Sequence, residues 1–166
     1  MRNKASFGAG IVVDESLEQK VRQLMDREEI KELTARYCWH VMRGESAKIV
    51  ELFADDAVFD NSANGGAVAN GRAELLKFYE GIRPLQAIPF IQNHIIEVNG
   101  DEAIATCAIE GRFTVKGDSL TGAGYYEDKY RRVNGQWRFA ARKLFLHHMV
   151  PLREGWASVH QAKKSL

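Results

Sequence analysis

The fold is set by residues 91–148, which read IQNHIIEVNGDEAIATCAIEGRFTVKGDSLTGAGYYEDKYRRVNGQWRFAARKLFLHH. Polar and apolar side chains alternate through much of this stretch, and that period is typical of β-strands. Asn99-Gly100-Asp101 and Asn134-Gly135 are strong hairpin-turn signals, and Gly117-Asp118 marks a further reversal of the chain. The pattern therefore predicts four consecutive antiparallel strands, over residues 91–98, 103–115, 125–133 and 137–148.

Helical signals precede these strands. Ser16 followed by Gln19 is a capping-box pattern, which predicts the start of a short first helix. Asp26 is expected to cap a second helix, and Gly44 to end it. Further elements are expected as a third helix from residue 46, a short strand over 57–59, a glycine-rich loop over 61–71 and a fourth helix over 72–79. Helices followed by a meander predict the α+β class, with a strongly curved antiparallel sheet and three to four helices on one face.

Length and charge limit the organisation of the chain. The 166 residues suit one domain, which we place at 14–148, between a flexible N-terminal arm over 1–13 and a tail over 149–166 that could pack on a neighbouring subunit. Because 23 basic residues nearly balance 22 acidic ones, nucleic-acid binding is disfavoured. No apolar run is long enough for a membrane span or a signal peptide, so we expect no membrane contact and a cytoplasmic location.

The two cysteines, Cys38 and Cys107, lie far apart in the chain and lack the spacing of zinc ligands. Both fall in apolar patterns, which favours buried free thiols. The sequence also lacks a phosphate-binding loop, a dinucleotide-binding glycine pattern and a metal-spaced set of His and Asp residues. We therefore expect a pocket that works without a metal or another cofactor.

Three local patterns, taken with this order of elements, resemble the SnoaL-like branch of the nuclear transport factor 2-like superfamily. They are IKEL at 30–33 leading through Tyr37 to LFADDAVF at 52–59, then NHIIEV with NGD at 93–101, then YEDKY at 126–130 with NGQW at 134–137. The resemblance covers about residues 20–148. It implies a cone-shaped α+β barrel whose sheet wraps a deep apolar pocket that the helices close.

Among the enzymes of that superfamily, the chain resembles scytalone dehydratase, bile-acid 7α-dehydratase and hexachlorocyclohexane dehydrochlorinase. These enzymes remove a proton and a leaving group across a carbon–carbon bond. The resemblance implies a His base four residues before Asn93 and an orienting Asp five residues after Tyr37. This chain carries Pro89 at the His position and Met42 at the Asp position, so it departs from the pattern at both halves of the proton-transfer pair.

The residues themselves suggest catalytic candidates. Tyr37 and His40 share a helix face, and could form a hydrogen-bonded acid/base couple if that face looks into the pocket. Alternatively, His40 complements the negative end of the helix dipole. Glu110 lies among apolar residues in its predicted strand, where burial would raise the pKa of its carboxyl and suit it to acid/base work. The alternative is an ordinary ion pair with Arg112 or with an arginine of a neighbouring strand.

Other residues are expected to contact a ligand. Asn93 and Tyr126 are candidates for positioning a substrate oxygen, and because strand side chains alternate, His94 and Tyr125 would then face the other way. The remaining expected ligand-binding residues are Trp39, Met42 and His147.

The first hypothesis is a cofactor-independent lyase, dehydratase-like, or isomerase that acts on a hydrophobic cyclic small molecule by general acid/base proton transfer. The alternative is a non-catalytic ligand-binding or assembly module that has lost the Asp/His pair. A third reading, the small subunit of a ring-hydroxylating dioxygenase, would give the domain a structural role. Because the outer face of a bent sheet often pairs with another copy, we also expect a homodimer or a homotrimer.

Overall fold

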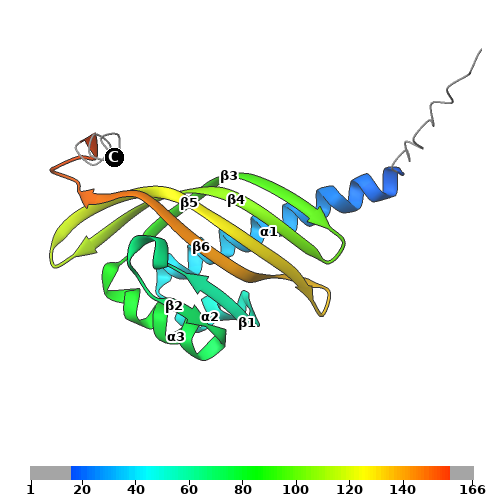
Figure 1. The fold of residues 1–166 in the computed structure, drawn as a ribbon, viewed down its shortest axis with the longest axis horizontal. Coiled ribbons are helices and arrows are strands. Elements are labelled where there is room, and N and C mark those ends of the chain that lie inside the picture. Colours follow the sequence, from blue (N-terminus) through cyan, green and yellow to red (C-terminus); the bar gives the residue numbers. More distant parts are fainter. Residues whose placement is uncertain (1–15, 158–166) are drawn as a thin grey trace, which may run out of the picture.

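A long helix lies across one face of a six-stranded sheet in the computed structural model of this protein, which describes residues 16–157 (Figure 1). The helices are α1 (Leu17–Arg43), α2 (Ser46–Glu51) and α3 (Gly71–Ile82). The strands are β1 (Phe53–Asp60), β2 (Val68–Asn70), β3 (Ile88–Asn99), β4 (Glu102–Val115), β5 (Asp118–Val133) and β6 (Gln136–Pro151). Their spatial order is β2-β1-β6-β5-β4-β3, and the sheet does not close into a barrel within the described residues. The α+β class and the curved sheet are confirmed.

Helix α1 is one continuous helix, so the predicted break at Asp26 is wrong. The capping box is confirmed, because the Gln19 backbone N–H donates to Ser16 Oγ and the Ser16 backbone N–H donates to Gln19 Oε1. Gly44 ends the helix in the left-handed region, at φ 65°. Asp26 caps nothing, because its carboxylate instead accepts hydrogen bonds from the side chains of Arg132 and Trp137. Its polar character serves a tertiary contact between α1 and the sheet.

The four predicted meander strands are confirmed as β3 to β6, each longer than the pattern predicted. All pairs among them are antiparallel. Strand β1 pairs with β6 in parallel, however, so the sheet is mixed rather than wholly antiparallel. The physical reason is that β1 follows helix α2 and enters the sheet beside the last strand, without a hairpin to reverse its direction. The predicted glycine-rich loop holds a 3₁₀ turn (Ser62–Asn64) and the short strand β2.

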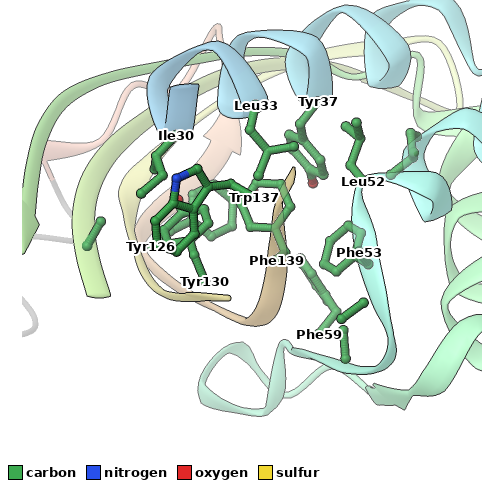
Figure 2. Close-up of a cluster of buried hydrophobic side chains, with 14 of the residues drawn as sticks. Ile30, Leu33, Tyr37, Leu52, Phe53, Phe59, Tyr126, Tyr130, Trp137 and Phe139 are labelled. Atoms are coloured by element: carbon green, nitrogen blue, oxygen red, sulfur yellow. The ribbon is translucent and has the colours of Figure 1, made fainter. Parts of the chain in front are cut away.

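The core lies between α1 and the sheet. Figure 2 shows Ile30, Leu33 and Tyr37 pointing from α1 toward Trp137 and Phe139 of β6. Both of these ring residues are at most 4% exposed, so they belong to the core. Each fully buried side chain of this size stabilises the fold by about 1.5–3 kcal/mol relative to exposure.

The ends of the domain are only partly described. Strand β6 continues through residues 149–151 of the predicted tail, whereas the predicted arm over 1–13 and the chain beyond 157 lie outside the described residues. Among the helices of residues 16–157, none combines the length and the apolar composition needed to cross a lipid bilayer.

Candidate functional site

A fully buried ion pair lies on the face of the sheet that is turned toward α1. Arg142 of β6 donates from Nε to Asp128 Oδ1 at 2.8 Å and from Nη2 to Asp128 Oδ2 at 2.7 Å. Neither side chain has any exposed surface. This two-bond geometry is the strongest form of an arginine–carboxylate contact, and it holds the guanidinium plane in one orientation.

Aromatic rings surround the guanidinium. Its carbon atom lies 4.0 Å from the ring centroid of Tyr126, 4.2 Å from that of Phe139 and 4.5 Å from that of Tyr37. Arg142 Nη1 is buried and has no hydrogen-bond partner among the described residues. Burial acts to lower the pKa of Arg142, but the adjacent Asp128 carboxylate outweighs it and raises that pKa well above its ordinary value. The site therefore contains a permanent positive charge with an unused donor.

Tyrosine hydroxyls add further donors. Tyr79 of α3 donates to the hydroxyl of Tyr37 at 3.4 Å, and Tyr130 donates to Asp128 Oδ2 at 2.8 Å. Burial raises the pKa of Tyr37, Tyr79 and Tyr126, although the Arg142 charge acts in the opposite direction. These phenols are therefore neutral around pH 7, and they can donate hydrogen bonds but are poor bases.

His94 also faces α1, which reverses our expectation for β3. Its Nε2 lies 2.9 Å from Thr34 Oγ1, within hydrogen-bond distance, and the same Thr34 hydroxyl lies 2.7 Å from the Lys31 carbonyl oxygen and 3.2 Å from that of Ile30. Asn93, expected inside, is exposed and adopts φ 56°. The reason is a bulge between Gln92 and Ile95, which shifts the alternation of the strand. Burial, followed by the Arg142 charge, lowers the pKa of His94.

The candidate residues of α1 divide between two environments. Tyr37 is 4% exposed and faces the sheet. His40 is bonded through Nδ1 to Glu45 Oε2 at 2.7 Å, across the junction between α1 and α2. The structure thus gives His40 a carboxylate partner and gives Tyr37 a phenol partner. Met42 is partly buried and packs against the core, whereas Trp39 is 56% exposed and has the Arg43 guanidinium over its ring.

Two further candidates lie on the sheet face away from α1. Glu110 is exposed, so the predicted burial of its carboxyl is wrong. The strand pleat explains this, because Cys107 and Ile109 of β4 face inward and Glu110 must face outward. His147 is exposed, and its ring centroid lies 5.7 Å from that of Tyr125. Tyr126 faces inward and is 3% exposed, as expected.

The space directly beneath Tyr37 is occupied by Phe53, Tyr79 and Phe139, whose ring centroids lie 5.9–6.4 Å from that of Tyr37. Partly buried apolar side chains pack against the wider core, namely Val41, Met42, Leu76, Phe78, Ile82, Ile91, Val98, Val133 and Leu144. Hollows of about 530 Å³ and about 450 Å³ lie elsewhere, on the outer side of the sheet and beside the turn between β4 and β5. An apolar pocket under α1 stays a prediction.

Asp128 and Arg142 were not among the residues that the sequence singled out. A signal for Asp128 was present, because Tyr126, Asp128 and Tyr130 alternate along one strand and must share a face. A carboxylate between two inward-facing tyrosines implies a buried cation nearby. No group of three or more His, Cys, Asp or Glu side chains within residues 16–157 is arranged to hold a metal ion.

Comparison with known proteins identifies the family. A profile of the SnoaL-like domain matches residues 22–143. The structure is similar to a proposed scytalone dehydratase from Novosphingobium aromaticivorans, with 23% identity over 80% of this chain and 91% of that one and a TM-score of 0.73. It is also similar to the hexachlorocyclohexane dehydrochlorinase LinA-type3 from Novosphingobium barchaimii, with 19% identity over 80% of this chain and 94% of that one and a TM-score of 0.72. An NTF2-like protein with a cystatin-like fold from Novosphingobium aromaticivorans shares 25% identity over 89% of this chain and 97% of its own, with a TM-score of 0.67. Because the profile spans most of the chain and the architecture agrees, this protein belongs to the SnoaL-like domain family of the NTF2-like superfamily.

Proposed function

We propose that this protein is a cofactor-independent lyase or isomerase that acts on a hydrophobic cyclic small molecule carrying a carbonyl or a leaving group. The observation that carries the proposal is the buried Arg142 guanidinium, with Nη1 unpartnered and three aromatic rings around it. Preorganised donors in a site without water stabilise negative charge that develops during a reaction. The names of two similar structures, a dehydratase and a dehydrochlorinase, support this class of chemistry.

The charge states of the side chains determine which of them can donate hydrogen bonds and which can act as the base. A base removes a proton from a carbon next to the activating group, and the electron pair of that C–H bond forms a double bond. In a lyase the leaving group then departs with its bonding pair. In an isomerase the proton returns to a different carbon. Arg142 and the hydroxyls of Tyr37 and Tyr126 would donate to the developing oxyanion or to the leaving group, because these phenols stay protonated.

We assign the base to His40. Its Nδ1 is bonded to the Glu45 carboxylate, which orients the ring and leaves Nε2 to accept a proton. His40 is followed in α1 by Val41 and Met42, which are partly buried and pack against the core. His94 is the other imidazole near the site, and its Nε2 is already engaged with Thr34. Replacing His40 and His94 singly by glutamine would show which of the two histidines acts as the base.

A non-catalytic binding module is the second candidate, and one specific observation favours it. Met42 and Pro89 occupy the positions at which the resemblance implies the Asp and the His, and Pro89 is buried in β3. Neither side chain can transfer a proton. Under this alternative, Arg142 and the aromatic rings of Tyr37, Phe53, Tyr79 and Phe139 would only bind an apolar ligand that bears an anionic or carbonyl group.

The test uses the full chain with a panel of cyclic β-hydroxyketones. Loss of water is followed by the absorbance of the conjugated enone, and proton exchange at carbon by NMR in D₂O. We expect turnover, a loss of about 10²-fold in kcat/KM for Tyr126→Phe, as for removal of one oxyanion donor, and little change for Tyr125→Phe on the opposite face of the same strand. Saturable binding without turnover or exchange would establish the binding module. Turnover that His40→Gln leaves unchanged would overturn the assignment of the base.

A further inference from the structure

Two glycines lie side by side on the face of the sheet that is turned toward α1. Gly111 of β4 pairs with Gly122 of β5, and both are buried. They share the inward face, because Gly111 follows the inward Ile109 by two residues and Gly122 precedes the inward Tyr126 by four. Glycine inside a strand weakens a sheet, and it often marks a place where a ligand or another backbone comes close. The pair forms a flat patch without side chains, which we call the glycine floor.

The ring of Phe113 lies on the glycine floor. A Cβ atom added to Gly111 would be 2.6 Å from Phe113 Cζ, and one added to Gly122 would be 3.3 Å from Phe113 Cε2. Carbon atoms in contact lie about 3.5–4.0 Å apart, so the ring fills the space that side chains at these two positions would need. The floor is therefore covered by an aromatic ring of its own chain.

Phe113 is held less firmly than the rings of the core. Its side chain is partly exposed, and it lies two residues before Val115, where β4 ends. Within residues 16–157, Phe113 belongs neither to the buried core cluster nor to the partly buried apolar side chains that pack against that cluster. Rotation about its side-chain bonds can therefore uncover the glycine floor and leave the core packing unchanged.

The last turn of α1 is directed toward the same part of the sheet. The Cys38 thiol contacts the backbone of Ile91, and α1 and β3 run in opposite directions. Met42, one turn after Cys38, is therefore directed toward Pro89, two residues before Ile91. Pro89 is buried and pairs with Gly111. The side chains of Met42 and Pro89 are apolar, so the surroundings of the glycine floor suit an apolar ring.

A second, independent feature of this interior points to a ligand. Arg142 Nη1 is buried and has no hydrogen-bond partner among the described residues. The guanidinium carbon of Arg142 lies 4.0 Å from the ring centroid of Tyr126, and Tyr126 follows Gly122 by four residues, about 13 Å along β5. A ligand whose polar group binds Arg142 can therefore extend its apolar part along β5 toward the glycine floor.

We propose that the glycine floor is the subsite for a flat, conjugated ring of the ligand, and that the Phe113 ring covers this subsite when no ligand is bound. The inference rests on the proposed function, because it requires a cyclic ligand beneath α1. The ligand takes the place of an aromatic ring, so it must be flat where it meets the floor, and a saturated ring is too thick. Phe113 lowers the apparent affinity, since only the molecules in which the floor is uncovered can bind.

The experiment measures the binding of two probes to the full chain by isothermal titration calorimetry. The probes share one carbon skeleton: 2-naphthol is flat, and decahydro-2-naphthol is its saturated counterpart. We expect the wild type to bind 2-naphthol at least about tenfold more tightly. Phe113→Ala should lower the Kd of 2-naphthol about tenfold, which corresponds to a floor that is covered in about nine of ten molecules. Gly111→Ala should raise this Kd about tenfold, because its methyl group stands on the floor.

Phe90→Ala and Gly81→Ala are the matched controls. Phe90 pairs with the outward Glu110 on the opposite face of the sheet, and Gly81 of α3 has open space at its Cβ position. Both variants should keep the wild-type Kd values, and circular dichroism checks the fold of every variant. The only atoms near a Cβ at Gly111 belong to Phe113, so Gly111→Ala combined with Phe113→Ala should fold even if Gly111→Ala alone does not. This double variant should bind 2-naphthol more weakly than Phe113→Ala.

Equal Kd values of the wild type for the two probes would overturn the proposal. So would a Phe113→Ala variant with the wild-type Kd, or no binding of either probe. The measurement needs no turnover, so its failure is distinct from failure of the proposed function. Turnover of the β-hydroxyketones without a preference for the flat probe would refute the ring subsite alone. Preference for the flat probe without turnover would support the ring subsite and refute only the catalytic role.

Discussion

Arg142 and Asp128 form a two-bond ion pair in which neither side chain reaches solvent. The pair organises the interior, because Tyr130 also donates to Asp128 and three rings lie against Arg142. Buried charges are costly to desolvate, and their attraction offsets that cost only when both partners are present. The buried pair beneath the longest helix, α1, therefore constrains the register of the sheet.

Breaking this pair should strongly destabilise the fold. Arg142→Met leaves the Asp128 carboxylate buried without its partner, and we expect the free energy of unfolding to fall by about 3–5 kcal/mol. The combined change Asp128→Leu with Arg142→Met should cost much less, because no charge is then left alone. Urea unfolding followed by circular dichroism measures both. Arg131→Met is the control, since Arg131 pairs with Asp56 at the surface and should matter by less than about 1 kcal/mol. Equal losses for the buried and the exposed arginine would contradict the argument.

Acid should weaken the fold through two carboxylates. Hydrogen bonds from Lys48 and then His40 lower the pKa of Glu45 from 4.5 to about 2, and hydrogen bonds from Ser62, followed by Lys143, lower that of Asp60 from 3.8 to about 2. A depressed pKa in the folded state means that the stability is present above the unfolded pKa and is lost as pH falls toward the folded one. We expect Tm to drop between about pH 4.5 and about pH 2.

The variant Glu45→Gln should reduce the part of this drop that depends on Glu45, and Asp60→Asn should reduce the other part. Scanning calorimetry at a series of pH values follows both variants beside the wild type. A pH dependence that neither change alters would show that other groups control the acid transition.

Both thiols should be inert in the native protein. Burial, reinforced by the neighbouring Asp128, raises the pKa of Cys107 to about 12, and burial also raises the pKa of Cys38. Since the thiolate is the reactive form, we expect almost no alkylation by iodoacetamide at pH 8 in the folded state. Mass spectrometry should show both sites modified after unfolding in guanidinium. Rapid native labelling of either cysteine would indicate that the core opens on the time scale of the reaction.

Two glycines should respond to alanine in opposite directions. A Cβ at Gly124 would meet the backbone carbonyl oxygen of Phe145, where β5 and β6 come close at a bulge, so Gly124→Ala should cost about 1–3 kcal/mol. Gly81 in α3 has open space around its Cβ position and an ordinary φ, so Gly81→Ala should stabilise by about 0.5–1 kcal/mol. Thermal unfolding of the two single variants compares them directly. A stabilised Gly124→Ala variant would mean that the strands can separate there at little cost.

Much of the fold could be predicted from local patterns. The turns at Gly100 and Gly135 specify hairpins by themselves, because their backbone geometry reverses the chain within a few residues. The capping box at Ser16 and the stop at Gly44 likewise act through neighbouring backbone groups. The single length of α1 could not be predicted in the same way, because Asp26 is satisfied by the distant Arg132 and Trp137 rather than by its own helix.

The site depended on features that no local pattern contains. Counting back from the Asn134-Gly135 turn pairs Asp128 with Ala141, and only the bulge between Lys129 and Tyr130 moves Arg142 into register with it. A second bulge brings His94 inward in place of Asn93. The sequence by itself determined the strands, the turns and the inward tyrosines, since alternation and turn geometry are local. The tertiary structure alone decided which charges meet in the core, because an inserted residue changes register only through the packing of whole strands.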